Sequence, residues 1–348
     1  MRITAGPAAA SAAGFVAAAL AAVSDPPPPI WRGAVGPLAL TVAAEGFPPG
    51  QDPLALLRYL ASAPPEPGGA PWHVTLLGPR GRLGPPPAAW PFPILDAAGF
   101  HRTLWAPERG LALASDEGHG VWSLADLAAR RAVLWLADPA RLPEWEITQP
   151  LRHALHWAAI RDGAVLAHAA AFGTAEARLL VAGPGGSGKS TLAAGAVAAG
   201  LEVLAEDLCW VEPGPPAPRA WRLYDSVKLT PAAVGRFAAA ARLAAGAEPF
   251  AKPTARLPPC PSRHGPITAL ACLAGRFAEA PSARPIGKAR AYALLAPSTV
   301  FLMRTATRET AARLGRLVEA LPAFELVPGR DPAETARFAL RLAREAAA

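Results

Sequence analysis

The sequence predicts an α/β protein with a parallel or mixed central sheet, and three consecutive patterns lead to this prediction. Two apolar runs, residues 164–172 and 177–182, have the composition of strands buried on both faces. A helical pattern follows at residues 190–200, and Gly200 is a suitable residue to end it. A third apolar run, residues 201–207, completes the order strand, helix, strand, which predicts a parallel βαβ unit.

The chain is expected to divide into a small α+β region, residues 1–149, and a larger α/β region, residues 150–348. Proline clusters separate short elements in the first region, which contains no catalytic motif and whose role the sequence does not indicate. Its predicted elements are strands at 38–43, 72–77, 111–115 and 133–137 and a helix at 53–61.

The second region is more regular. Apolar residues recur at helical spacing in 150–162 and 306–321, and residues 323–327 have the pattern of a strand. Asp331 is a suitable N-cap, with Pro332 at the first helical position, so a last helix is expected to begin there.

The composition is typical of a soluble protein. The hydrophobic fraction of 52% is rich in alanine, and no stretch is apolar enough for a spanning helix. The net charge of +7 comes from scattered arginines, so we expect neither a nucleic-acid nor a membrane partner. Cys209, Cys260 and Cys272 lie far apart without CxxC spacing, which favours a reducing, cytoplasmic location.

The first residues leave two interpretations open. Arg2 before an alanine-rich stretch faintly imitates a signal peptide. The alternative, which we favour, is a helix with Phe15, Leu20 and Val23 on its inner side, ended by Asp25 and the prolines that follow it.

A glycine-rich turn between the second strand and the helix contains the pattern GxxxxGK[ST]. Glycines allow backbone N–H groups to face phosphate oxygens, and the helix N-terminus adds partial positive charge. Lys189 is expected to reach the β- and γ-phosphates, and Ser190 to bind Mg²⁺. The residues predicted to bind ATP are Gly183, Pro184, Gly185, Gly186, Ser187, Gly188, Lys189, Ser190 and Thr191.

Two carboxylates, Glu206 and Asp207, end the next predicted strand. One helix and one strand separate them from Lys189, so they are expected near the phosphate loop, where ligands of open α/β sheets bind. Asp207 is the expected metal ligand beside Ser190. Either carboxylate could take the proton of an attacking hydroxyl, and the sequence leaves this division open. Neither an LSGGQ-like segment nor an NKxD motif is present, which disfavours transport ATPases and GTPases.

A histidine, the phosphate loop and the acid pair follow one another closely, in LAHAAAF with His168, GPGGSGKST and LAEDLCWV. In this order they resemble the C-terminal catalytic domain of HPr kinase/phosphorylase and its relatives. The segments PLRHALHW, LYDSVKL and LAPST extend the similarity over about the last two hundred residues. The resemblance implies a P-loop kinase domain of the HPr kinase/PEP carboxykinase-like type, with Lys189, Glu206, Asp207 and His168 as catalytic residues.

The chain departs from the family pattern in two respects. Glu206 stands where the family usually has the first aspartate of an Ala-Asp-Asp ending, and the later signature loop linked to HPr binding is not found. HPr is therefore not the expected substrate. The resemblance implies another hydroxyl acceptor, a serine of a peptide or protein or a small metabolite, and a possible homo-oligomer.

Further candidates each have a structural alternative. His168 could orient a phosphate or the acid pair, or be a core histidine. Lys228 could contact phosphate, although an exposed lysine is the more common case. Lys252 and Arg256 could close over the transferred group or belong to a flexible basic loop.

A separate pair, His153 and His156, has metal-compatible spacing on a helix, but we expect both side chains to lie on the helix surface.

The expected function is that of an ATP- and Mg²⁺-dependent kinase. A nucleotide-sensing module without chemistry and a simple ATPase are the alternatives. The loop recognises phosphates rather than bases, so it does not identify the donor, and nothing in the sequence identifies the acceptor.

Overall fold

The computed structural model of the protein describes residues 12–64, 70–88, 101–215 and 217–347. Contacts divide the chain into two compact units, the first comprising Met1–Arg161 with Arg304–Ala306 and the second Asp162–Met303 with Thr307–Ala348. The helix after Pro150 was expected in the C-terminal region, but its contacts place it in the first unit.

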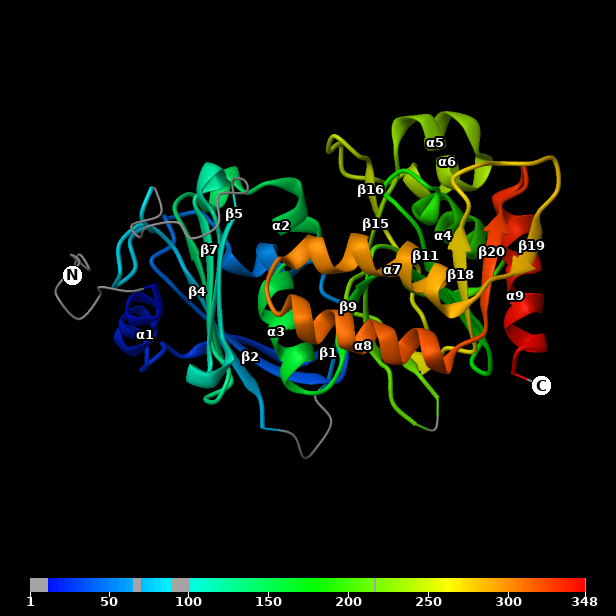
Figure 1. Ribbon diagram of the computed structural model, residues 1–348. Coiled ribbons are helices and arrows are strands. Elements are labelled where there is room, and N and C mark those ends of the chain that lie inside the picture. The colour runs from blue at the N-terminus through cyan, green and yellow to red at the C-terminus, as the bar shows by residue number, and fades with distance from the viewer. Residues whose placement is uncertain (1–11, 65–69, 89–100, 216, 348) are drawn as a thin grey trace. The chain divides into compact units, whose positions relative to one another are not determined.

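Among the described residues, the first unit forms an eight-stranded mixed sheet in the order β3-β1-β2-β4-β8-β7-β6-β5. Its strands belong to the blue to green part of the ribbon in Figure 1. Neighbouring strands are parallel from β2 through β4 to β8 and antiparallel elsewhere. The strands are β1 (Pro29–Val35), β2 (Leu38–Glu45), β3 (Ser62–Ala63), β4 (Trp72–Leu77), β5 (His101–Ala106), β6 (Leu111–Asp116), β7 (Val121–Asp126) and β8 (Arg131–Leu136). The α-helices are α1 (Ala12–Ala22), α2 (Glu144–Thr148) and α3 (Arg152–Arg161), and the short 3₁₀ helices are η2 (Pro53–Leu57), η3 (Pro107–Arg109), η4 (Glu117–His119) and η5 (Pro139–Arg141).

The N-terminal helix expected from the sequence is present as α1 within the described residues, and residues 1–11 of that expectation lie outside them. The α1 side chain Phe15 packs with its ring centroid 5.8 Å from that of Trp122 and 6.4 Å from that of Trp135. These aromatic contacts fix the helix on strands β7 and β8 of the sheet.

One predicted element of this unit is wrong. The helix expected at 53–61 is the short 3₁₀ helix η2, which begins where the Asp52 side chain accepts a hydrogen bond from the Leu54 N–H. It ends early because the chain turns to form β3, whose Ser62 and Ala63 pair with β1. The four strands predicted for the first region are confirmed as β2, β4, β6 and β8.

The described part of the second unit contains a six-stranded sheet in the order β12-β10-β11-β18-β20-β19, a four-stranded sheet in the order β17-β14-β13-β9, and the pair β15-β16. The strands are β9 (Val165–His168), β10 (Ala170–Gly173), β11 (Arg178–Ala182), β12 (Glu202–Ala205), β13 (Leu208–Glu212), β14 (Arg219–Trp221), β15 (Ser226–Lys228), β16 (Thr254–Arg256), β17 (His264–Pro266), β18 (Ala269–Leu273), β19 (Ser282–Pro285) and β20 (Ala323–Val327). The helices are α4 (Lys189–Ala198), α5 (Pro231–Arg236), α6 (Ala238–Ala244), α7 (Lys288–Met303), α8 (Thr307–Ala320) and α9 (Pro332–Glu345).

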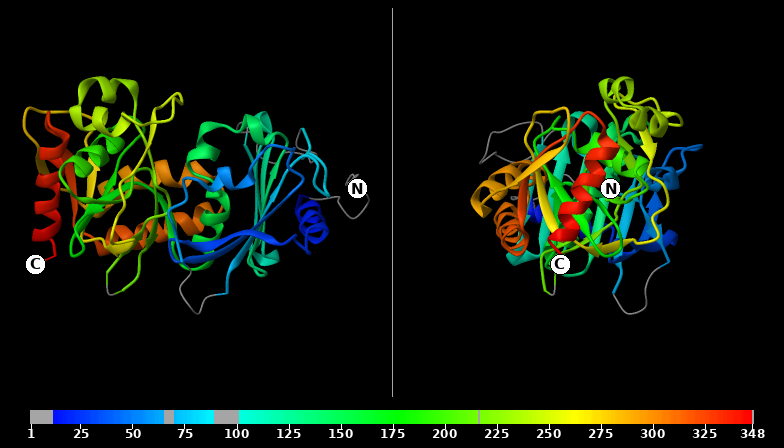
Figure 2. Two further views of the ribbon diagram at one scale, coloured as in Figure 1. Left: turned by 180° about the vertical axis from the view of Figure 1, so that it is seen from behind. Right: turned by 90° about the vertical axis from the view of Figure 1, so that its right-hand side faces the viewer.

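Helices cover both faces of the six-stranded sheet (Figure 2). Along β11, Leu179 and Val181 pack into one core with α4 and α9, whereas Leu180 and Ala182 pack into the other with α7 and α8. This two-sided burial explains why the strand is a continuous apolar run in the sequence. The expected last helix is α9, and Asp331 caps it by accepting from the Ala333 N–H at 2.8 Å.

The sheet is mixed, and the predicted unit of two parallel strands joined by a helix is present as β11, α4 and β12, with one strand between the two. β11 pairs in parallel with β18, and β18 with β20. The strand after α4, β12, is separated from β11 by β10, which runs antiparallel to both. β11 and β12 therefore share a direction without pairing. The two units together are mixed α/β, as expected in this coarse form.

Candidate functional site

The phosphate loop, residues 183–191, connects β11 to α4 in a conformation that depends on its glycines. Gly186 and Gly188 have φ of 78° and 103°, a region that costs L-residues free energy. At Gly183 the reason is space, because a Cβ there would lie 2.6 Å from the Ser187 Oγ. The loop therefore depends on glycine for conformation at two positions and for close approach at a third.

The loop offers several hydrogen-bond donors to a ligand. The N–H groups of Gly186 and Gly188 have no acceptor in the part of the chain that the structure describes. The buried Ser187 Oγ likewise has no hydrogen-bond partner among the described residues. Gly186 is exposed and Gly188 is partly buried, but the Ser187 hydroxyl is buried, and buried polar groups are normally satisfied. Unpaired donors in one glycine-rich loop are suited to binding an anion.

Lys189 lies over this loop. Its Nζ donates to the carbonyl oxygens of Gly183 at 2.7 Å and Pro184 at 3.2 Å. Burial lowers its pKa; the carboxylates of the acid pair oppose this effect, and the charge of Lys252 adds to it. A lysine whose charge is only partly compensated favours a nearby anion.

The acid pair, Glu206 and Asp207, lies where the chain passes from β12 of the six-stranded sheet to β13 of the four-stranded sheet. The first predicted strand, residues 164–172, crosses between the same two sheets, because β9 ends at His168 and β10 begins at Ala170. It is therefore two strands rather than one. His168 pairs with Leu208, so the two crossings place His168 beside the acid pair.

The two carboxylates have different partners. The Ser190 hydroxyl donates to Glu206 Oε1, and the backbone N–H of Lys228 donates to its Oε2 at 3.4 Å. Asp207 lies between a histidine and a lysine: its Oδ1 is 2.8 Å from His168 Nε2, and its Oδ2 is 2.5 Å from Lys228 Nζ. Ser190, the expected metal ligand, is therefore paired with Glu206 rather than with Asp207.

These partners separate the pKa values of the pair. Burial, followed by the charge of Asp207, raises the pKa of Glu206 to about 7. Burial would also raise the pKa of Asp207, but Lys228 and the hydrogen bond from His168 outweigh it and hold that pKa well below its usual range. Glu206 can therefore exchange a proton near neutral pH, whereas Asp207 stays ionised.

Lys228 belongs to the site, although the sequence favoured an exposed lysine. It ends β15, which pairs with β16 so that Lys228 faces Thr254 and Ser226 faces Arg256. Its side chain is 14% exposed because it reaches Asp207. A lysine after a proline-rich loop gives no signal of this, since the partner lies on another strand.

Thr299 is a positioning residue that the sequence did not single out. It lies on α7, and its Oγ1 accepts from the His168 backbone N–H at 3.0 Å. The LAPST segment thus helps hold the end of β9. For Lys252, the electrostatic effect on Lys189 indicates proximity to the phosphate loop.

The histidine pair His153 and His156 lies in the first unit. His156 is buried rather than on the helix surface, because its Nε2 bonds to the Thr305 carbonyl oxygen at 3.1 Å. Within the described residues, no group of three or more His, Cys, Asp or Glu side chains could hold a metal ion. The spacing of the two histidines therefore does not indicate a metal site.

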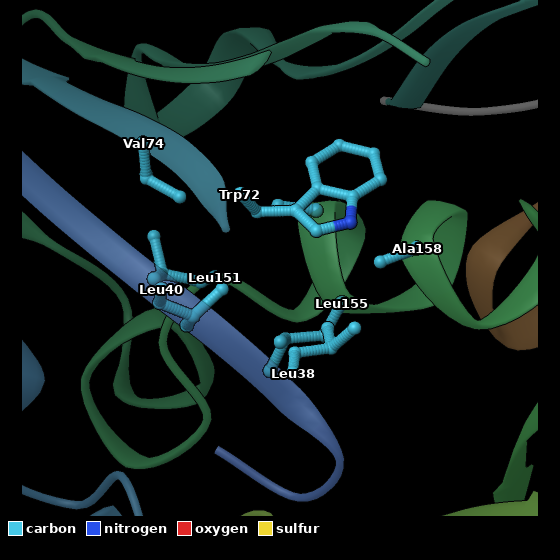
Figure 3. Close-up of a pocket in the computed structure, with 8 residues that line it drawn as sticks. Leu38, Leu40, Trp72, Val74, Leu151, Leu155 and Ala158 are labelled. Carbon is cyan, nitrogen blue, oxygen red and sulfur yellow. The ribbon is translucent and has the colours of Figure 1, made fainter. Parts of the chain in front are cut away.

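A hollow in the first unit, with a volume of about 200 Å³ that includes space open to solvent, has a different character (Figure 3). It is formed by β2, β4 and α3, and Trp72 is its largest side chain. All its lining residues are apolar or aromatic, and none is an acid, a base or a nucleophile: Leu38, Leu40, Trp72, Val74, Leu151, Ala154, Leu155 and Ala158. We assign no chemistry to it.

The phosphate loop and acid pair fit a nucleotide and Mg²⁺. The donors of the loop fit phosphate oxygens. The Ser190 hydroxyl and the Glu206 carboxylate provide two oxygens in direct contact, and oxygen is the ligand that Mg²⁺ prefers. The raised pKa of Glu206 is consistent with a position that favours a nearby cation.

In comparisons with known proteins, no family model and no curated protein matches the chain. None of the helices in the described residues is long and apolar enough to cross a membrane.

Proposed function

We propose that the protein is an ATP- and Mg²⁺-dependent kinase that transfers the γ-phosphoryl group to a hydroxyl of a peptide, a protein or a small metabolite. The observation that carries this proposal is the contact between the phosphate-loop hydroxyl of Ser190 and Glu206, with Asp207 held next to it by His168 and Lys228. A phosphate loop, a metal-compatible oxygen pair and a second, ionised carboxylate are the parts that phosphoryl transfer requires.

The roles follow from the contacts. The loop N–H groups and Lys189 bind the phosphates, and the oxygens of Ser190 and Glu206 hold the metal. Mg²⁺, when bound, supplies charge neutralisation at the β- and γ-phosphate oxygens. This assigns the metal to Glu206 beside Ser190, in place of the Asp207 expected from the sequence.

Asp207 is then the carboxylate that accepts the proton of the acceptor hydroxyl. It is ionised at neutral pH, and in a loose transition state the hydroxyl proton needs little driving force until late in the transfer. His168 and Lys228 hold both oxygens of the carboxylate in place. These two residues are positioning groups for Asp207.

The contacts of His168 and Lys228 with Asp207 also support the alternative of a nucleotide-sensing module. A carboxylate that accepts hydrogen bonds from a lysine and a histidine, and whose pKa is lowered, is a weak base. The module predicts ATP binding without phosphoryl transfer to any acceptor. A plain ATPase predicts release of inorganic phosphate in the absence of an acceptor.

The test is incubation of the purified protein with γ-labelled ATP, Mg²⁺ and a lysate of its host, beside the variants Lys189→Ala and Arg308→Ala. Arg308 is exposed on α8 and serves as the charge-matched control. We expect label in a discrete acceptor with the wild type and the control, and at least about 10²-fold less with Lys189→Ala. Circular dichroism checks that the Lys189 variant is folded.

Equal transfer by the Lys189 variant would refute the kinase assignment. Binding of ATP without any labelled acceptor or released phosphate would favour the sensing module instead.

A further inference from the structure

A second hollow lies directly beside the phosphate loop; it is shallow, and its volume of about 240 Å³ includes space open to solvent. One wall consists of Gly188, Thr191 and Leu192. Phe237, between α5 and α6, and Phe277, after β18, form aromatic walls. The loop after β20 and the start of α9 complete the lining. The hollow therefore begins where the phosphate loop ends and is mainly apolar.

Phe277 is a large aromatic residue that is exposed to solvent. Its side chain is 47% exposed, so it adds little to the core. Its Cζ lies 3.5 Å from where a Cβ on Gly188 would be, which places the ring against the phosphate loop. The Arg236 guanidinium lies 5.3 Å from the ring centroid of Phe237 and 5.9 Å from that of Phe277. An exposed aromatic ring at this position is suited to stacking on a ligand.

Building on the proposed nucleotide binding, we propose that this hollow is the base subsite of the phosphoryl donor, in which a purine stacks on Phe277. Thr191 follows Ser190 in the chain and lines the hollow, so a nucleotide whose terminal phosphates lie at Ser190 extends past Thr191 toward the aromatic walls. Phe237 and Arg236 form the remainder of the stacking surface. Base–aromatic stacking depends on ring area and is tolerant of base identity.

The polar groups of the loop after β20 are already engaged. The Gly329 N–H donates to Thr335 Oγ1 at 3.0 Å, and Thr335 Oγ1 donates to the Asp331 carbonyl oxygen at 3.0 Å. The Pro328 carbonyl oxygen accepts from the Ala278 N–H at 2.9 Å. These groups do not offer a pattern that distinguishes adenine from guanine. The subsite should therefore bind ATP and GTP alike, and pyrimidine nucleotides more weakly because their rings are smaller.

The test is calorimetric titration with ATP, GTP, CTP and inorganic tripolyphosphate, all with Mg²⁺. The proteins are the wild type, Phe277→Ala and Phe301→Ala. Phe301 is 70% exposed on α7 and controls for loss of an exposed phenylalanine. We expect Phe277→Ala to weaken ATP and GTP about tenfold, the loss of one stacking contact, with tripolyphosphate affinity unchanged. Phe301→Ala should bind every ligand as the wild type does.

The outcomes separate the two proposals. Wild-type affinity for tripolyphosphate equal to that for ATP would overturn the base subsite while leaving the phosphate loop as a binding site. Unchanged ATP affinity in Phe277→Ala would overturn it as well. Absence of binding of both ATP and tripolyphosphate would overturn the proposed function, and the base subsite with it.

Discussion

The phosphate loop and the acid pair meet at one contact, Ser190 with Glu206, yet they obtain their properties in different ways. The loop is continuous in sequence, and its shape comes from glycines within it, such as Gly186 and Gly188 with positive φ. The acid pair obtains its properties from partners on other strands, His168 on β9 and Lys228 on β15. The shape of the phosphate loop is thus determined by residues within the loop, whereas the pKa values of the acid pair are determined by residues distant in the sequence.

The acid pair also shows that adjacent residues need not share an electrostatic environment. Glu206 is buried and Asp207 is 20% exposed, but only Asp207 has both a histidine and a lysine side chain at hydrogen-bond distance. The pKa of Glu206 rises to about 7, whereas that of Asp207 falls well below its usual range. Opposite shifts of this kind separate the roles of two carboxylates at one site.

The largest effect is expected for Asp207→Asn, which tests whether the acid pair performs chemistry that the loop does not. The variant keeps the shape of the side chain but removes the proton acceptor. Transfer from γ-labelled ATP should fall by about 10³-fold. The dissociation constant for ATP should stay within about threefold of the wild type, because the loop is intact.

Glu345→Gln, at an exposed position on α9, is the control for loss of one carboxylate. Transfer by Asp207→Asn at the wild-type rate would assign the proton step to another group. A large loss of ATP affinity would show that the two regions act as one binding unit.

Glu206→Gln tests the raised pKa through stability. The folded protein holds a proton on Glu206 up to a pKa of about 7, whereas the unfolded chain releases it near the ordinary value of 4.5. The folded protein therefore loses stability as the pH rises from about 4.5 to 7. Glutamine does not titrate, so the variant does not lose this stability. The variant should unfold on the order of 5 °C higher than the wild type at pH 8 and show little change at pH 4.5.

Thermal unfolding followed by circular dichroism at the two pH values provides the measurement. Equal midpoints for wild type and variant at pH 8 would show that Glu206 titrates near its ordinary value. The wild type should also bind Mg²⁺ with ATP more weakly below pH 7, because the protonated carboxyl is a poor metal ligand.

The same contrast explains how much the sequence could predict. The phosphate loop, the strand before it and the helix after it are encoded by neighbouring residues, and so is the Asp331 cap of α9. The change of sheet at Ala169 was not predictable, because the apolar run 164–172 has no local mark where its partner strand changes. Lys228 and His156 were misjudged for the same reason, since their partners Asp207 and Thr305 are distant in sequence.

The smallest effect is expected from a matched pair in the loop, Gly186→Ala and Gly185→Ala. A Cβ at either position meets no atom within 4 Å, so neither substitution is excluded by space. The two glycines differ in backbone conformation, because Gly186 has a positive φ of 78° and Gly185 does not have a positive φ. Alanine at Gly186 should cost about 1 kcal/mol of strain and weaken ATP about fivefold, whereas alanine at Gly185 should change affinity less than twofold.

Calorimetric titration of ATP with Mg²⁺ into both variants measures this difference. Equal losses at both positions would mean that bulk near the phosphates, rather than backbone conformation, limits binding. Equal retention would mean that the loop relaxes at little cost, and its shape would then depend on the surrounding strands as strongly as the acid pair does.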